Sequence, residues 1–223
     1  KNGGMREVFP LKGKLSGFWT EEEEGRLAKP LGIKTPTGAF MAKVISLYFH
    51  PCGALRSVTL WPGEVVEVET PLGPIASRVG VSFYENGQLR SLEPQKPTRV
   101  ATPIGEFLAF DPDPDGISGD RNSLVFDEEG RIRQLSTLTE QVSVTREGVK
   151  EVFTPALKES LCQESQMVVL PLKIFFWEGG VAVEGREFSF VNYEVKAEPF
   201  LGDIKPMALN LGRQNSPTLP IWK

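Results

Sequence analysis

The sequence predicts a mostly β fold, in which antiparallel β-meander or hairpin repeats stack into an extended or curled sheet with one or two short helices. Three observations support this fold class. Two turn signatures recur in the same order along the first two thirds of the chain, the segments between them alternate with a period of two residues, and helical signals are confined to short stretches.

The first signature is an aromatic residue followed by a glycine-containing turn and a basic strand. It occurs three times, at 48–57 (YFHPCGALRS), 83–91 (FYENGQLRS) and 125–134 (VFDEEGRIRQ). Glycine supplies the positive φ angle that tight turns need, and Asn86-Gly87 is the strongest hairpin signal among the three copies. We therefore expect each copy to be a β-hairpin.

The second signature is Thr-Pro-x-Gly, in which proline presets one corner of a turn. It occurs at 35–38, 70–73 and 102–105, and 145–148 (TREG) is a degenerate fourth copy. Gly87 precedes Thr102 by 15 positions, Gly130 precedes Thr145 by the same number, and Gly53 precedes Thr70 by 17. These similar spacings support a unit of roughly 30 to 40 residues, a length typical of stacking repeats.

The segments between these turns have the pattern of half-buried strands. Val66 and Val68 alternate with Glu67 and Glu69, which places the valines on one face and the glutamates on the other. Further strands are expected at 79–83, 168–177, 181–183 and 188–195, and the tail at 205–223 has no regular pattern.

Two short helices are expected outside the repeats. Thr20 followed by Glu23 matches a capping box, and the acidic first turn suits a helix that ends before Pro30. A second helix is predicted to begin at Thr154-Pro155 and to run towards Cys162. The expected organisation is a hairpin-repeat region with an N-terminal cap at 1–150 and a C-terminal β segment with an irregular tail at 151–223. One continuous domain is the alternative.

Composition narrows the classes of partner. The chain has 25 basic and 29 acidic side chains, a net charge of −4, and its basic residues are scattered, so nucleic acid is not an expected partner. No run of apolar residues is long enough to span a membrane. We expect a soluble, cytoplasmic protein without cofactors, and export is the alternative if a signal peptide preceded Lys1.

The hairpin at 83–91 resembles the core of a MORN-type repeat and of its bacterial relatives named as antitoxins. The likeness rests on an aromatic residue, Asn-Gly and an apolar residue, and it covers about 48–135, with Thr-Pro-x-Gly in place of the Gly-x-Gly half of the MORN unit. The whole chain also resembles bacterial proteins assembled from the same units. The resemblance implies a hairpin architecture and an interaction or scaffold module without catalytic residues.

Catalytic signals are weak in this sequence. His50 is the only histidine, and its register with 85–86 and 127–129 of the other hairpins predicts that it fills a turn. We therefore name no catalytic residue and expect a non-catalytic protein-interaction module. The alternative is an enzyme or binding protein for a carbohydrate-like polar substrate that uses paired carboxylates in an aromatic-lined pocket.

One segment between the two turn signatures is longer than the corresponding segment in the other copies. Gly73 precedes Phe83 by 10 positions, whereas Gly105 precedes Phe126 by 21, so about ten extra residues interrupt this copy. Insertions in repeats are placed in loops on one face, frequently the binding face.

The insertion has a metal-site pattern. The candidate metal ligands are Asp111, Asp113, Asp115 and Asp120, because alternate carboxylates followed by Gly116 resemble the start of a Ca²⁺ loop. Position twelve of that loop is Asn122 instead of glutamate, and two prolines stiffen the segment. A solvated, turn-rich loop is favoured, and a weak Ca²⁺ site is the alternative.

Overall fold

The computed structural model describes residues 4–10, 21–114, 119, 121–159 and 167–200. Its strands are β1 (Glu7–Val8), β2 (Leu31–Thr35), β3 (Gly38–Ala42), β4 (Val44–Phe49), β5 (Leu55–Leu60), β6 (Val66–Thr70), β7 (Gly73–Phe83), β8 (Leu89–Pro94), β9 (Thr98–Thr102), β10 (Gly105–Ala109), β11 (Leu124–Phe126), β12 (Ile132–Thr137), β13 (Glu140–Arg146), β14 (Val149–Phe153), β15 (Ala156–Glu159), β16 (Met167–Leu170), β17 (Leu172–Trp177), β18 (Gly180–Val183), β19 (Arg186–Ser189) and β20 (Glu194–Pro199). In the described part of the chain, α1 (Glu21–Leu27) is the one helix. The predicted fold class is confirmed.

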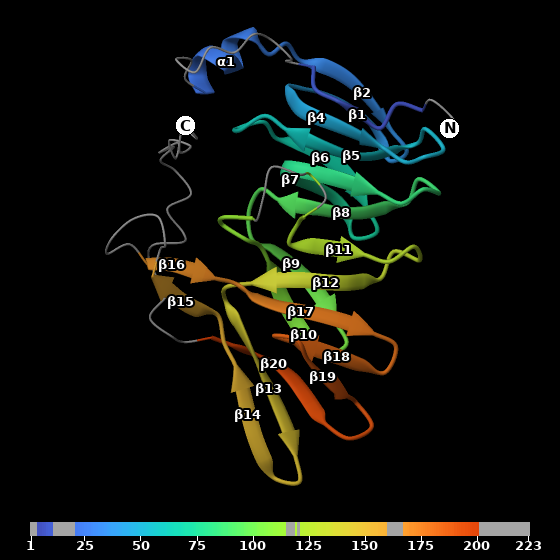
Figure 1. Ribbon diagram of the computed structural model, residues 1–223. Coiled ribbons are helices and arrows are strands. Elements are labelled where there is room, and N and C mark those ends of the chain that lie inside the picture. Colours follow the sequence, from blue (N-terminus) through green and yellow to red (C-terminus); the bar gives the residue numbers. More distant parts are fainter. Residues whose placement is uncertain (1–3, 11–20, 115–118, 120, 160–166, 201–223) are drawn as a thin grey trace.

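A long antiparallel sheet runs through most of the molecule (Figure 1). Its strands follow the order β1-β4-β5-β7-β8-β11-β12-β17-β18-β19, so the order in the sheet follows the order in the sequence. β12 pairs with β17, and for this reason the segment after residue 150 continues the same sheet.

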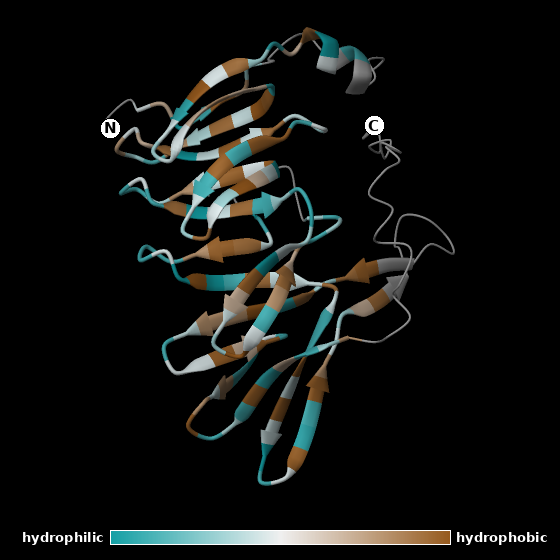
Figure 2. Ribbon diagram, turned by 180° about the vertical axis from the view of Figure 1, so that it is seen from behind, coloured by the Kyte–Doolittle hydropathy of each residue, from teal (hydrophilic) through white to brown (hydrophobic). Residues whose placement is uncertain are grey.

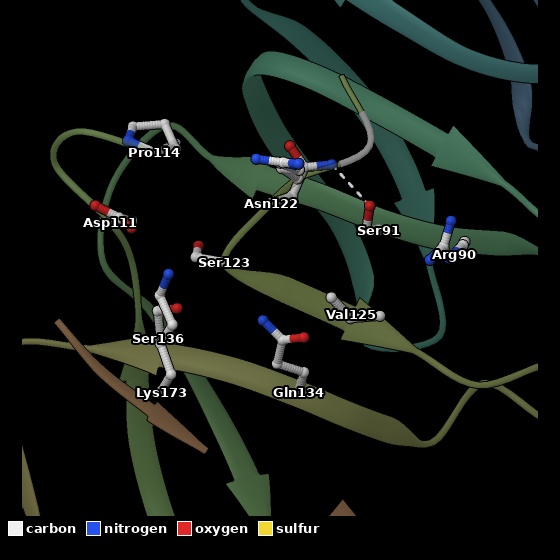
Figure 3. Close-up of a pocket in the computed structure, with 11 residues that line it drawn as sticks. Arg90, Ser91, Asp111, Pro114, Asn122, Ser123, Val125, Gln134, Ser136 and Lys173 are labelled. Atoms are coloured by element: carbon white, nitrogen blue, oxygen red, sulfur yellow. Dashed lines mark hydrogen bonds between the residues drawn. The ribbon is translucent and has the colours of Figure 1, made fainter. Parts of the chain in front are cut away.

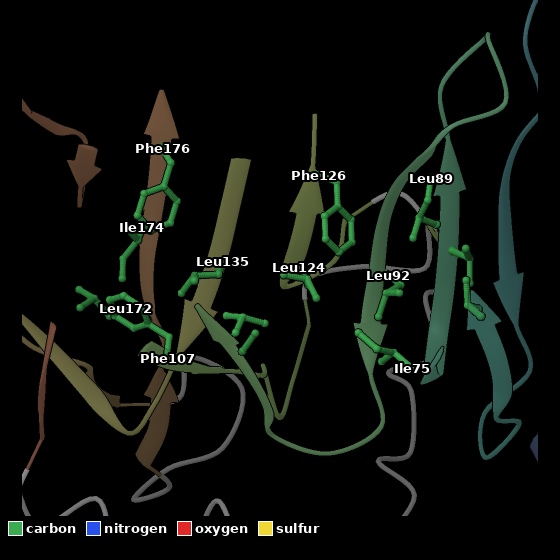
Figure 4. Packing of buried hydrophobic residues seen from close by; sticks show 14 of the residues in the cluster. Ile75, Leu89, Leu92, Phe107, Leu124, Phe126, Leu135, Leu172, Ile174 and Phe176 are labelled. Atoms are coloured by element: carbon green, nitrogen blue, oxygen red, sulfur yellow. The ribbon is translucent and has the colours of Figure 1, made fainter. Parts of the chain in front are cut away.

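Short hairpins cover one face of the long sheet. They are formed by β2 with β3, by β6 with the first half of β7, and by β9 with β10, and a three-stranded sheet of β14, β13 and β20 follows them. Their buried residues, such as Val68 and Phe107, join Val58, Leu92 and others of the long sheet in one apolar cluster. Figure 4 shows the leucine, isoleucine and phenylalanine side chains of this core.

The two faces of the long sheet differ because neighbouring residues of a strand point to opposite sides. Leu124 pairs with Leu92 on one side and with Leu135 on the other, and all three side chains are fully buried in the core. Apolar and polar segments alternate along the strands in Figure 2. The outer face, which points away from the core, is consequently rich in serine and threonine.

The three copies of the aromatic signature form turns with the same hydrogen bonds. In each turn, the residue after the phenylalanine donates its N–H to the residue four positions on, and the glycine donates back to that first residue, at 2.8 to 3.0 Å. The glycines, Gly53, Gly87 and Gly130, have φ angles of 90°, 89° and 80°. Positive φ is the reason that glycine stands at this place in every copy.

The Thr-Pro-x-Gly copies are also alike in structure. The hydroxyls of Thr35, Thr70 and Thr102 donate to the carbonyl of the glycine three residues on, at 2.8, 2.6 and 2.7 Å. Two of these prolines pack on glycines of the aromatic hairpins, Pro36 on Gly87 and Pro71 on Gly130. A Cβ atom on Gly130 would lie 2.9 Å from Cγ of Pro71.

Neighbouring hairpins of the long sheet are also joined by bonds to a backbone carbonyl. The His50 ring lies 3.0 Å from the carbonyl oxygen of Phe83, and the Tyr84 hydroxyl donates to that of Phe126 at 2.8 Å. His50 therefore occupies a turn, as the sequence predicts, and holds one hairpin to the next.

Three sequence predictions need correction. The strand expected at 168–177 is two strands, β16 and β17, which are separated at Pro171 and belong to different sheets. The segment predicted to form a helix after Thr154-Pro155 forms β15, which pairs with β16, and 160–162 lies outside the described residues. Residues 188–195 form the end of β19 and the start of β20, separated by a turn in which Tyr193 donates its N–H to Ser189. The tail at 205–223 lies outside the described residues. Among the helices described, none has the length and apolar character needed to cross a bilayer.

Two connections between a short hairpin and the next strand of the long sheet are much longer than the equivalent connection at the start of the chain. β3 is joined to β4 by Lys43 alone, whereas residues 110–123 separate β10 from β11 and 154–171 separate β14 from β17. The first of these connections contains the predicted acidic insertion, and we call it the covering loop (110–123).

Candidate functional site

The described residues of the covering loop (110–114, 119 and 121–123) lie on the outer face of the long sheet, and two glycines permit this close approach. A Cβ atom on Gly80 would lie 2.2 Å from Cα of Gly119, and one on Gly119 would lie 2.1 Å from the carbonyl oxygen of Val58. The N–H of Gly119 donates to the hydroxyl of Thr59 at 2.9 Å. Loop and sheet are therefore in direct backbone contact.

The structure describes only two of the four predicted metal ligands. Asp111 is buried, and its Oδ1 accepts the N–H of Asp113 at 3.0 Å, while the Asp113 side chain is exposed. Asp115 and Asp120 lie outside the described residues. Within the described ranges, no three Asp, Glu, His or Cys side chains gather as a metal site requires, so the Ca²⁺ site stays a prediction.

A buried carboxyl group, Glu93, fixes both ends of the covering loop. Its side chain is fully buried, and its oxygens accept the N–H of Asp111 at 3.2 Å, the N–H of Ser123 at 2.8 Å and the hydroxyl of Ser123 at 2.9 Å. Burial raises the pKa of Glu93 from 4.5 to about 7, because an ionised group is poorly solvated in the interior. The bonds from Ser123 and Asp111 and the charge of Arg78 act in the opposite direction.

Arg78 holds the start of the loop from the side. Its guanidinium donates to the carbonyl oxygens of Pro94, at 3.3 Å, and of Asp111, and it lies 4.9 Å from the centre of the Phe110 ring. It also lies 3.9 Å from a Glu93 oxygen. Arg78 and Glu93 together hold Asp111 and Ser123, near the two ends of the loop, against the sheet's outer face.

A hollow of about 300 Å³ lies between this loop and the sheet, and we call it the polar hollow (Figure 3). The loop contributes five of its lining residues, and strands β8, β11, β12 and β17 contribute the others. The lining residues are Arg90, Ser91, Asp111, Pro114, Arg121, Asn122, Ser123, Val125, Gln134, Ser136 and Lys173. Three of these are basic and one is acidic, in a chain whose net charge is −4.

Asn122 is the lining residue with an unused hydrogen-bonding atom. The residue is 6 % exposed, and its Nδ2 donates to the Ser91 hydroxyl at 2.7 Å and to the Gly119 carbonyl at 2.9 Å. Because Gly119 offers an acceptor, the amide nitrogen must point there, and Oδ1 is the remaining acceptor. Oδ1 is buried and has no hydrogen-bond partner among the described residues.

The described lining residues offer charged and hydrogen-bonding groups. Asp111 is the one carboxylate among them, none of them is aromatic, and the hydroxyls of Ser91 and Ser123 bond to Ser82 and Glu93. A glycosidase-type site needs two carboxyl groups across the substrate. His50, on the β4–β5 hairpin, is not among the residues that line the hollow.

Most of these lining residues have no signal of a site in the sequence. Arg90-Ser91 stands where Arg56-Ser57 stands in the preceding copy of the aromatic signature, so nothing in the sequence distinguishes it from that copy. The available signal is the row of small residues Ser57, Ser82 and Ser91, which pair across three strands. Small side chains in a row allow another segment to approach the sheet closely.

Comparison with known proteins adds no assignment. No family model, no curated protein and no solved structure matches the chain.

Proposed function

We propose that the protein is a non-catalytic interaction module that binds a negatively charged partner at the polar hollow. The observation that carries the proposal is the lining, in which the described residues include three basic side chains, Arg90, Arg121 and Lys173, and one carboxylate, Asp111. Basic side chains in a partly enclosed site attract anions more strongly than the same residues spread over a surface. The resemblance to MORN-type repeats, which are regarded as interaction modules, supports the same function.

The architecture supports binding as well. Glu93 and Arg78 anchor the covering loop at both ends, so the lining is formed before a partner arrives. A preformed site does not lose conformational entropy when it binds, and affinity improves accordingly.

The proposal is tested by NMR titration of the ¹⁵N-labelled protein with an acetylated tetraglutamate peptide and with its tetraglutamine analogue. We expect the acidic peptide alone to shift the amide signals of Ser91, Asn122 and Ser123, and we expect the shifts to decrease as salt is raised. Equal responses to the two peptides would contradict the proposal.

Single-residue variants locate the binding. Lys173→Gln and Arg90→Gln should each weaken tetraglutamate binding by about tenfold, equivalent to about 1.4 kcal/mol. Arg99→Gln is the matched control, because Arg99 is an exposed arginine on β9 that pairs with Glu106. Wild-type affinity in both hollow variants would place the peptide elsewhere and refute the assignment.

A further inference from the structure

Strand β14 has a free edge at one end of the three-stranded sheet (Figure 1). It pairs with β13 over five residues without a register shift, and in the described part of the chain no strand pairs with its other side. Four of its five residues are exposed, so its side chains do not cover the edge. A row of unpaired N–H and C=O groups of this kind is a template for another strand.

The hairpin geometry shows which backbone groups of β14 point to the free edge. Arg146 and Val149 flank the two-residue turn Glu147-Gly148, whose φ angles of 51° and 82° are those of a type I′ turn. The two residues that flank such a turn exchange hydrogen bonds, and bonded pairs then alternate along the hairpin. Lys150 and Val152 therefore direct their N–H and C=O groups away from β13, where the described residues offer no backbone partner.

The charged side chains of β14 are balanced within the chain. Lys150 Nζ reaches across β13 and donates to both carboxylate oxygens of Glu198 on β20, at 2.9 and 3.1 Å, so it lies over the sheet and does not block the edge. The carboxylate of Glu151 accepts a hydrogen bond from Arg186 of β19. The edge thus offers backbone groups and an exposed apolar side chain, Val152 (44 % exposed), without an excess charge that would select a charged partner.

A second β14 strand offers the same groups in return. When two copies pair antiparallel about a two-fold axis, only outward-pointing residues exchange bonds, so within the strand the axis lies at Lys150, Glu151 or Val152. The first register places lysine opposite lysine and the second places glutamate opposite glutamate, and like charges in these positions destabilise a sheet. The third places Val152 opposite Val152 of the other copy, and the two exposed valines cover each other.

The third register also brings opposite charges together. It places Glu151 opposite Phe153 of the other copy, and within each chain the Arg186 guanidinium lies 5.3 Å from the centre of the Phe153 ring. Each Glu151 therefore gains a second arginine while it keeps its own. Because a guanidinium has five N–H donors, it can bond to two carboxylates at once.

We infer that β14 binds β14 of a second copy of this chain, antiparallel and about a two-fold axis at Val152. The contact uses the same surface on both copies, so the assembly is complete with two chains. A single short strand makes a small interface, and we expect a Kd on the order of 10⁻⁴ M. No residue of β14 lines the polar hollow, so the inference does not rest on the proposed function.

The test combines small-angle X-ray scattering with amide hydrogen exchange of the full chain, from about 10 μM to about 1 mM protein. We expect a monomer–dimer equilibrium in which exchange of the Lys150 and Val152 amides slows about fourfold over this range, as the monomer fraction falls. A monomer at every concentration, or assemblies larger than a dimer, would overturn the inference. Protection that does not depend on concentration would place another segment of the same chain on the edge, and would overturn it too.

A charged variant locates the interface. Val152→Lys should weaken dimerisation at least about tenfold, because two like charges would face each other across the axis. Val65→Lys is the matched control, since Val65 has a similar exposure (41 %) and lies before β6, and it should dimerise like the wild type. Amide spectra show whether each variant is folded. Unchanged dimerisation of folded Val152→Lys would mean that the copies meet at another surface.

A cysteine variant tests the register without adding charge. Bonded pairs of an antiparallel sheet have Cα atoms about 5.5 Å apart, which a disulfide spans. In a chain that also carries Cys52→Ser and Cys162→Ser, Val152→Cys should give a covalent dimer on mild oxidation, and Val65→Cys is the control. Cross-linking of Val152→Cys no faster than that of Val65→Cys would refute the axis at Val152.

Discussion

Replacing Glu93 by glutamine should remove a large pH dependence from the stability of the protein. Glu93 is fully buried, and burial raises its pKa from 4.5 to about 7. The folded protein therefore keeps a proton on this group at pH values where the unfolded chain has lost it. Since glutamine does not titrate, Glu93→Gln isolates this contribution.

The sign and size follow from linkage between protonation and folding. Each unit of pKa difference corresponds to about 1.4 kcal/mol, so a rise from 4.5 to about 7 is equivalent to about 3 kcal/mol. Below about pH 4.5 both states are protonated and Glu93 has no such cost. As pH rises from about 4.5 to about 7, the wild type should lose about 3 kcal/mol of stability through this group.

Glutamine also has a cost that does not depend on pH. Its Nε2 replaces one of the two oxygens and faces the N–H of either Asp111 or Ser123, which then lacks an acceptor, and one unsatisfied buried donor costs about 1–3 kcal/mol. The wild type and the variant are therefore compared by the difference between their unfolding free energies at each pH. The informative result is how this difference changes with pH.

The assay is urea unfolding followed by tryptophan fluorescence between about pH 4.5 and about pH 8. The chain has four tryptophans, which provide the signal. Glu67→Gln, on the exposed face of β6, is the control and should follow the wild type at every pH. Parallel curves for wild type and Glu93→Gln across this range would show that Glu93 does not carry the raised pKa.

The remaining predictions concern turns, loop contact and metal. Gly53→Ala should lower the free energy of unfolding by about 1 kcal/mol because of its positive φ. Gly130→Ala should lower it by at least about 1 kcal/mol more, because its Cβ would also meet Pro71. Equal losses of stability in thermal unfolding would argue against that packing. Gly80→Ala should destabilise the protein by about 1–3 kcal/mol and shift the Gly119 amide signal, and an unchanged spectrum would contradict the backbone contact. In calorimetry, any Ca²⁺ binding by the wild type should show a Kd on the order of 10⁻⁴ M or weaker, and it should be lost in the double variant Asp113→Asn/Asp115→Asn. Identical titrations of wild type and variant, without heat, would show that the loop has no Ca²⁺ site.

The hairpin frame could be predicted from the sequence because its signals are local. Asn86-Gly87 and the Thr-Pro-x-Gly copies specify turns by backbone chemistry alone, and the alternation of Val66 and Val68 with two glutamates sets the buried face of β6. The prediction of a helix after Thr154-Pro155 was wrong because the structure there is decided by a contact that is not local. Pairing of β15 with β16 is a contact between distant residues and outweighs the local helical preference.

The candidate site could be predicted only in part. The spacing between Gly105 and Phe126 located the covering loop, but nothing local indicates that Glu93 lies beneath it or that Lys173 lies across the hollow. Glu93 follows Leu92 in a strand where a solvated glutamate would have the same pattern. Its burial depends on a loop that begins 17 residues later in the chain, and this relation is visible only in three dimensions.

The two long connections lie apart from the contacts that join one hairpin to the next. The aromatic turns, the prolines packed on Gly87 and Gly130 and the carbonyl bonds between hairpins are all formed by residues outside 110–123 and 154–171. A change in the length or sequence of a connection therefore leaves the local signals that specify the hairpins as they are.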